Sequence, residues 1–203
     1  QALYAPAHLL YKRIEPMADN FADLETRING RADYFAKREA DPEFRGFHRL
    51  EYGLFGQGQG DLKALQPVAN TLAADVDTLK TRLAVLETQP ERLARLLRRT
   101  ADNLPNGGEE GWSHAEAADL QGTLDGTKKL ANLVLPMLTK PAPDLKKSIE
   151  DGFAQFAKEL EPYRDGDGFK PGALPADARQ AITATVSKLA DDLAKVNAVL
   201  KLE

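Results

Sequence analysis

The longest regular pattern in this chain lies at residues 61–86, DLKALQPVANTLAADVDTLKTRLAVL. Its apolar side chains recur every three or four residues, at Leu62, Leu65, Ala69, Leu72, Val76, Leu79, Leu83 and Leu86. Because an α-helix has about 3.6 residues per turn, this spacing gathers them on one face. The stretch predicts a long helix, capped by Asp61, that packs against its neighbours at a shallow angle. A cofactor-binding stripe is the alternative, but a leucine row of this spacing is typical of a core.

Helical spacing continues through most of the chain. Apolar residues recur with it over residues 10–28, 93–97, 120–138, 145–160 and 182–200. Pro16 predicts a kink in the first of these helices, and Asn29-Gly30 predicts its end. No stretch alternates apolar and polar residues for long enough to predict a convincing strand. We therefore expect an all-α fold of antiparallel helices in two packed four-helix-type bundles.

The chain is long enough to form one domain over residues 1–203 with a stable core. The loop Asn106-Gly107-Gly108 predicts its division into sub-bundles of roughly residues 1–105 and 106–203. The 27 basic and 31 acidic residues are interspersed and give a net charge of −4, which does not favour nucleic-acid binding. The absence of cysteine excludes disulfides, thiolate zinc sites and cysteine catalysis. No run of about 18 apolar residues is present, so we expect no membrane span.

A histidine and a glutamate stand out in the stretch Asp41 to Phe55. Asp41 as N-cap and Pro42 as first helical residue predict a helix that runs to the glycine-rich break at 56–60. His48 and Glu51 then lie on its apolar face, with about 5–6 Å between their Cβ atoms. Two interpretations follow: a core histidine hydrogen-bonded to a glutamate, which the common spacing alone favours, or a pair that binds one metal ion.

The residues around His48 and Glu51 favour the second interpretation, a pair that binds a metal ion. Gly46-Phe47-His48-Arg49-Leu50-Glu51 resembles the Gly-x-His-x-x-Glu signature of the imelysin/EfeO family of bacterial envelope proteins. Ile14-Glu15-Pro16 is similar to the Ile-Glu-Pro element of that family, and residues 163–169 are similar to its C-terminal loop. The resemblance runs in order over nearly the whole chain. It implies a periplasmic protein of an iron-uptake system, which captures a divalent metal and delivers it to a membrane permease.

The resemblance also implies a set of metal ligands. These are His48, Glu51, Glu15, Glu116 at the start of a later helix, and Asn29, where the family is expected to have an acid. Fe²⁺ is the ion implied, and a site of one imidazole with carboxylates also suits Zn²⁺, Mn²⁺ or Cu²⁺. A signal peptide and a further helix, the first of the first bundle, would precede Gln1 in such a protein.

Other interpretations remain open for several of these residues. Glu116 could complete a capping box with Ser113, and Glu15 could be a solvated charge. The basic row Arg92, Arg95, Arg98 and Arg99 could bind an acidic polysaccharide, a role associated with alginate-binding relatives of the family, or could form a solvated face paired with acids. A metallopeptidase is a more distant alternative, because the motif His-Glu-x-x-His is absent, and we expect no enzymatic activity.

Overall fold

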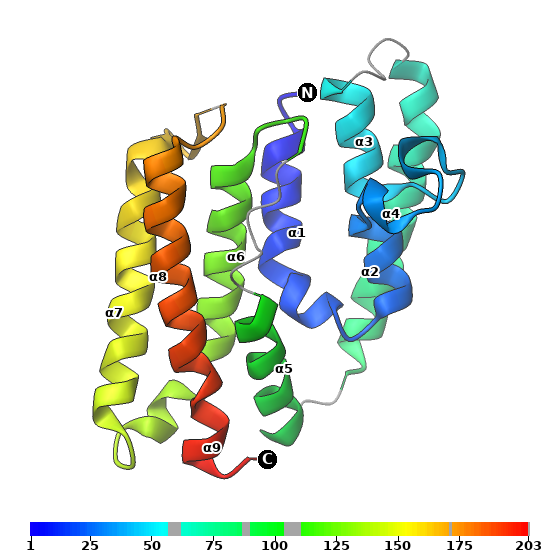
Figure 1. Cartoon of the computed structure of the whole chain (residues 1–203). Helices are drawn as coiled ribbons and strands as arrows, with labels where there is room; N and C mark the ends of the chain where they lie inside the picture. Colours follow the sequence, from blue (N-terminus) through cyan, green and yellow to red (C-terminus); the bar gives the residue numbers. More distant parts are fainter. Residues whose placement is uncertain (57–61, 87–89, 104–110, 171, 203) are drawn as a thin grey trace.

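The computed structural model describes residues 1–203 except 57–61, 87–89, 104–110, 171 and 203, and the fold is predominantly α-helical (Figure 1). The α-helices are α1 (Tyr4–Ala18), α2 (Ala22–Asn29), α3 (Gly46–Phe55), α4 (Leu62–Ala84), α5 (Pro90–Asn103), α6 (Glu116–Ala131), α7 (Pro143–Leu160), α8 (Ala176–Ala194) and α9 (Val196–Leu200). Short 3₁₀ helices lie at η1 (Ala32–Tyr34), η2 (Arg38–Ala40), η4 (Leu135–Leu138) and η5 (Glu161–Tyr163). Strands β1 (Arg164–Asp165) and β2 (Gly168–Phe169) form a small antiparallel hairpin. The all-α prediction is confirmed.

The buried apolar side chains form two clusters. Helices α1 to α4 build the first cluster, from Tyr4, Tyr11, Ala18, Leu24, Ile28, Phe47, Leu72 and Leu79. Helices α5 to α9 build the second, larger cluster around side chains that include Leu97, Leu124, Phe153, Phe156, Leu189 and Leu193. Figure 1 shows α1 beside α6, so this helix pair joins the two halves. The division into sub-bundles at residue 105 stays a prediction.

Two glycines of α6 allow α1 to approach very closely. A Cβ atom added at Gly122 would lie 2.5 Å from the carbonyl oxygen of Leu9 and 2.6 Å from Cβ of Lys12. One turn further on, a Cβ atom at Gly126 would clash with the carbonyl oxygen of Arg13. Glycine has no Cβ, and the two helices therefore meet almost backbone to backbone at this contact.

The first predicted helix is wrong in two respects. It does not continue through residues 10–28, because the chain turns between Ala18 and Ala22, and Pro16 lies inside α1 rather than at the break. The prediction that the face of α1 with Leu10 is buried is also wrong, since Leu10 is 57% exposed. The buried residues lie instead on a neighbouring stripe of the helix that includes His8 and Tyr11, because this stripe faces α3 and α6.

Other predicted helix ends are shifted. The helix expected from Asp41 begins at Gly46, and the Asp41 side chain instead accepts the N–H groups of Lys37 and Glu43 in a turn. The helix expected to reach Leu138 ends at Ala131, because the chain turns there and Pro136 lies in η4. The last helix is divided at Lys195. The predicted cap Asp61 and the loop Asn106-Gly107-Gly108 lie outside the described residues.

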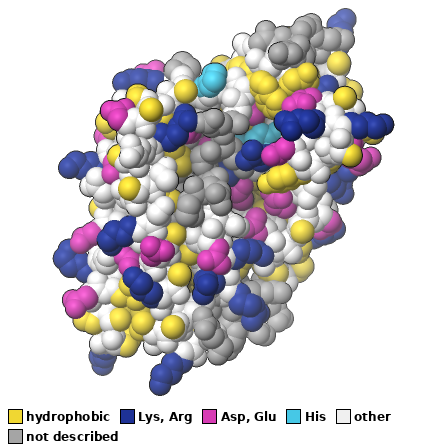
Figure 2. Space-filling model, in the orientation of Figure 1, with side chains coloured by type: hydrophobic (Ala, Val, Ile, Leu, Met, Phe, Trp, Pro, Cys, Tyr) yellow, Lys and Arg dark blue, Asp and Glu magenta, His cyan; other side chains and the backbone are white. Residues whose placement is uncertain are grey.

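The surface carries charges of both signs. Figure 2 shows Lys and Arg side chains interspersed with Asp and Glu over the visible face, as the composition predicts. Within the described part of the chain, no helix is long and apolar enough to cross a membrane.

Candidate metal centre

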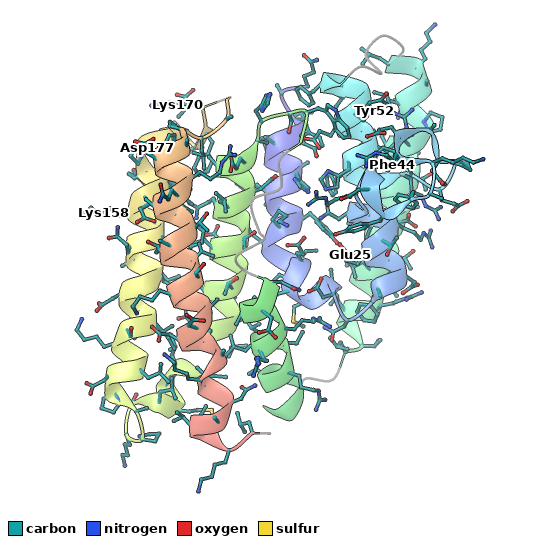
Figure 3. The ribbon with its side chains drawn as sticks, in the orientation of Figure 1. Glu25, Phe44, Tyr52, Lys158, Lys170 and Asp177 are labelled. Carbon is teal, nitrogen blue, oxygen red and sulfur yellow. The ribbon has the colours of Figure 1, made fainter. Side chains whose placement is uncertain are left out.

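A seam of buried polar side chains runs between α1, α2, α3 and the start of α6. We define this polar seam as His8, Lys12, Glu15, Asn29, His48, Glu51, Ser113 and Asp119. Figure 3 labels Tyr52 and Phe44 on the α3 side of this region and Glu25 on α2. Most seam residues are inaccessible to water, so each polar atom needs a partner within the protein or a bound ion.

The predicted pair His48 and Glu51 is in contact within α3. His48 Nδ1 lies 3.1 Å from Glu51 Oε2, and both side chains are buried. Burial raises the pKa of Glu51, but hydrogen bonds from His48 and Ser113 outweigh it, so the pKa lies below its ordinary value. Glu51 is therefore a carboxylate at neutral pH. Since Nδ1 faces this carboxylate, Nε2 is the ring nitrogen suited to bind a metal.

The segment before α6 lies directly over Glu51. Ser113 donates its N–H to Glu51 Oε1 at 2.9 Å and its hydroxyl to the same oxygen. A Cβ atom at Gly111 would clash with the Glu51 carboxylate, so a larger residue there would displace this carboxylate. The predicted capping box is wrong: α6 begins at Glu116 after Ala115 without a side-chain cap, because Ser113 is engaged with Glu51.

His8 links α1 to both α2 and α6. Its Nδ1 lies 2.8 Å from Asp119 Oδ1, and its Nε2 lies 2.8 Å from Asn29 Oδ1. The amide nitrogen of Asn29 faces a Glu15 oxygen at 3.2 Å, which assigns the amide oxygen to His8. Both ring nitrogens of His8 therefore face acceptors, and only an imidazolium donates to both. The His8 and His48 ring centroids are 5.6 Å apart.

Glu15 is half-buried and paired with a lysine. Lys12 Nζ lies 2.7 Å from Glu15 Oε1 and 2.6 Å from Glu15 Oε2. The Lys12 side chain is only 2% exposed. The ammonium group of a lysine thus lies within the seam, one helical turn from His8 on the same face of α1.

Glu116 lies apart from the other predicted ligands. Its Oε2 accepts the N–H of Leu174 at 3.3 Å and a guanidinium hydrogen of Arg179 at 3.0 Å. Burial, chiefly, and the nearby Asp119 charge raise the pKa of Glu116 above its ordinary value. The structure therefore brings together His48 with Glu51 and Asn29 with Glu15, and turns Glu116 towards α8. Among the described residues, no three His, Asp or Glu side chains converge closely enough to hold a metal ion as they stand.

Comparison with known proteins identifies the family. Residues 1–196 match the model of the imelysin family. The chain belongs to this family. It is also 36% identical over 208 residues to proteins described as "Iron uptake system component EfeO" in Escherichia coli K12, Escherichia coli O157:H7 and Shigella flexneri. Each alignment covers 100% of this chain and 55% of the relative, so the chain spans about half the length of the relatives it matches. The resemblance stated from the motifs is confirmed.

Four seam residues of this imelysin-family chain were not predicted as site residues. They are His8, Lys12, Ser113 and Asp119. Three of them carried a signal. His8 and Lys12 precede Glu15 at spacings of four and three on one helical face. Asp119 follows Glu116 by one helical turn, which also places the two on one face. No local pattern predicts the contact of Ser113 with Glu51.

The arginine row on α5 is partly neutralised by acids. Arg98 pairs with Asp102 at 3.2 Å, and Arg99 pairs at 3.4 Å with Asp19, which directly follows α1. The Arg92 side chain lies outside the described part of the chain. For Arg98 and Arg99 the structure thus matches the interpretation of a face paired with acids.

Proposed function

We propose that this chain is the metal-binding part of a bacterial iron-uptake component that acts in the periplasm. It captures a divalent metal, Fe²⁺ first, at the polar seam and delivers it to the components of a membrane permease. Membership of the imelysin family and the similarity to iron uptake system components support a role in iron uptake. The proposed role is binding rather than catalysis.

The charge balance of the seam is the observation that carries this proposal. Glu15 is paired with the ammonium group of Lys12, whereas Glu51 and Asp119 each pair with an imidazole. An imidazole is positive only while it holds a second proton. Two buried carboxylates thus face imidazoles rather than a lysine or arginine. A divalent cation supplies two charges that match these carboxylates, and its binding competes with protons at the same donor atoms.

The donor atoms fit the proposed ion. Imidazole nitrogens and carboxylate oxygens together suit Fe²⁺, and also Mn²⁺, Zn²⁺ or Cu²⁺, better than they suit Ca²⁺ or Mg²⁺. We propose His48 and Glu51 as the centre of the site, with Asn29 and Glu15 beside them and His8 with Asp119 as further donors. Glu116 stays a predicted ligand that joins the site only by releasing Arg179.

Anaerobic calorimetric titration with Fe²⁺ tests the proposal. Wild type should bind Fe²⁺, release protons, and bind more weakly as the pH is lowered from about 7 to about 5. His48→Ala should weaken binding at least about tenfold without changing the helical circular dichroism signal, because one direct ligand is lost. His114→Ala is the matched control, since His114 is the third histidine of the chain and is exposed outside the seam. Equal affinities of the His48 and His114 variants would contradict the proposal.

A further inference from the structure

Lys12 is an unusual residue for a cation-binding seam. Its ammonium group is buried and lies within hydrogen-bond distance of both oxygens of Glu15. Removing an ammonium from water is costly unless an opposite charge and hydrogen bonds replace the lost water. Glu15 supplies both, and Asn29 donates a further hydrogen bond to the same carboxylate. Lys12 and Glu15 thus form a charge pair within the polar seam, where a bound metal ion would add further positive charge.

The position of Lys12 follows from the packing of α1 on α6. Gly122 faces Cβ of Lys12, and no larger residue fits between them. The lysine stem therefore starts against the α6 backbone, and its charged end reaches Glu15 one turn along α1. This arrangement needs a glycine on one helix and an i, i+3 acid on the other.

We propose that Lys12 is the resident cation of the seam and that it sets the metal affinity and selectivity of this chain. This inference rests on the proposed metal binding. In the metal-free protein, Lys12 stabilises the fold by neutralising Glu15. In the metal-bound protein, the same ammonium repels the ion and keeps the Glu15 carboxylate from it. The ligands that remain are richer in imidazole, which favours transition metals over Ca²⁺ and Mg²⁺.

The inference predicts two effects of opposite sign for one substitution. Lys12→Met keeps an apolar stem of similar length and removes the charge. It should lower the melting temperature of the metal-free protein, because Glu15 loses its partner. It should also tighten Fe²⁺ binding by about tenfold or more, because a like charge a few ångströms from the ion is gone and Glu15 is released. A purely structural lysine would lower stability and affinity together.

Two further variants make the test specific. Lys12→Arg keeps the charge, and its Fe²⁺ affinity should stay near that of wild type. Lys195→Met is the control, because the exposed Lys195, directly after α8, pairs with Asp192 at the same i, i+3 spacing outside the seam. It should leave Fe²⁺ affinity unchanged. If Lys12→Met does not fold, the double variant Lys12→Met/Glu15→Gln is compared with Glu15→Gln, and the double variant should bind Fe²⁺ more tightly.

The possible outcomes separate this inference from the proposed function. If wild type binds Fe²⁺ and Lys12→Met binds it equally or more weakly, the inference is overturned and the proposed function stands. If only the variant binds Fe²⁺, the inference is supported and the proposed function of the native chain is overturned. If neither binds Fe²⁺, both are overturned.

Discussion

The two halves of the molecule are built from helices with the same apolar periodicity, but they bury side chains of different chemistry. Between α5 and α9 the interior is mainly apolar, and Phe156, Leu160 and Leu193 are almost wholly buried among other hydrophobic side chains, although Asp192 and Asn197 are buried there too. Between α1, α2, α3 and α6 the interior contains the polar seam beside a smaller apolar cluster. Apolar burial stabilises a fold by about 25 cal/mol per Å², whereas buried charge pairs contribute little net stability. We infer that α5 to α9 stabilise the fold and that the seam provides binding.

The largest expected effect on stability comes from a substitution in the apolar half, between α5 and α9. Phe156 is fully buried in the second cluster, so Phe156→Ala leaves a cavity as well as losing apolar contact. We expect a loss of about 3–5 kcal/mol in the free energy of unfolding, measured by urea denaturation. The folded fraction should keep the Fe²⁺ affinity of wild type, because the seam is untouched. A cost below about 1 kcal/mol would show that the apolar half does not dominate stability.

The next effect concerns the contact that joins the halves. Gly122→Ala places a methyl group against the Leu9 carbonyl oxygen and the Lys12 side chain, so α1 must move away from α6. We expect a loss of about 1–3 kcal/mol in unfolding free energy, together with weaker Fe²⁺ binding, because His8 would separate from Asp119. Gly152→Ala on α7 is the control. Its nearest neighbour is a Leu189 methyl carbon at 3.1 Å, which can shift, and Fe²⁺ binding should not change.

The comparison also shows which features are visible in the sequence. Most long helices were predicted, because an apolar period of three and four residues is local information, but α1 and α2 were predicted as one helix. The buried face of α1 was not predicted. The most apolar stripe of this helix, with Leu10, lies at the surface, whereas the stripe with His8 is covered by α3 and α6. Which stripe is buried depends on neighbours that are distant in the sequence.

The same distinction applies to the site. His48 and Glu51 were found because they are three residues apart on one helix. His8 and Asp119 are separated by 111 positions, and they meet only because α1 packs on α6 at Gly122. The pairing of Lys12 with Glu15 is local, but its burial is not, since that depends on the same helix contact. The members of the polar seam were thus partly predictable, whereas the way their charges are paired was not.

A smaller effect is expected from adding a negative charge to the seam. Asn29→Asp adds a negative charge between His8 and Glu15. We expect Fe²⁺ affinity to rise several-fold, about 1 kcal/mol, after repulsion between the carboxylates is subtracted. The metal-free protein should melt at a lower temperature, because Glu15 loses an amide donor. Asn70→Asp, on the exposed face of α4, is the control and should change neither quantity. An unchanged affinity in Asn29→Asp would place Asn29 outside the site.

The smallest expected effect concerns pH and the border between the halves. Asp19 lies at the end of α1 and pairs with Arg99 of α5. Burial, the largest cause, and the Glu15 charge raise the pKa of Asp19 from 3.8 to about 6, although Arg99 and Lys12 oppose the shift. Between about pH 4 and pH 6 the folded protein therefore binds a proton at Asp19 that the unfolded chain does not bind. The stability from this proton is complete below pH 4 and is lost as the pH rises through 6.

Replacing the carboxylate by an amide should remove that pH dependence. Relative to Asp19→Asn, wild type should gain stability as the pH is lowered from about 7 to about 5. We expect a gain of under about 1 kcal/mol, because partial exposure screens the charge. Thermal unfolding of both proteins across this range measures the difference. Asp102→Asn is the control, since Asp102 pairs with the neighbouring Arg98 of the same helix at the surface. If the stabilities of wild type and Asp19→Asn depend on pH in the same way, burial does not raise the pKa of Asp19. The border between the two halves would then be accessible to water at this residue.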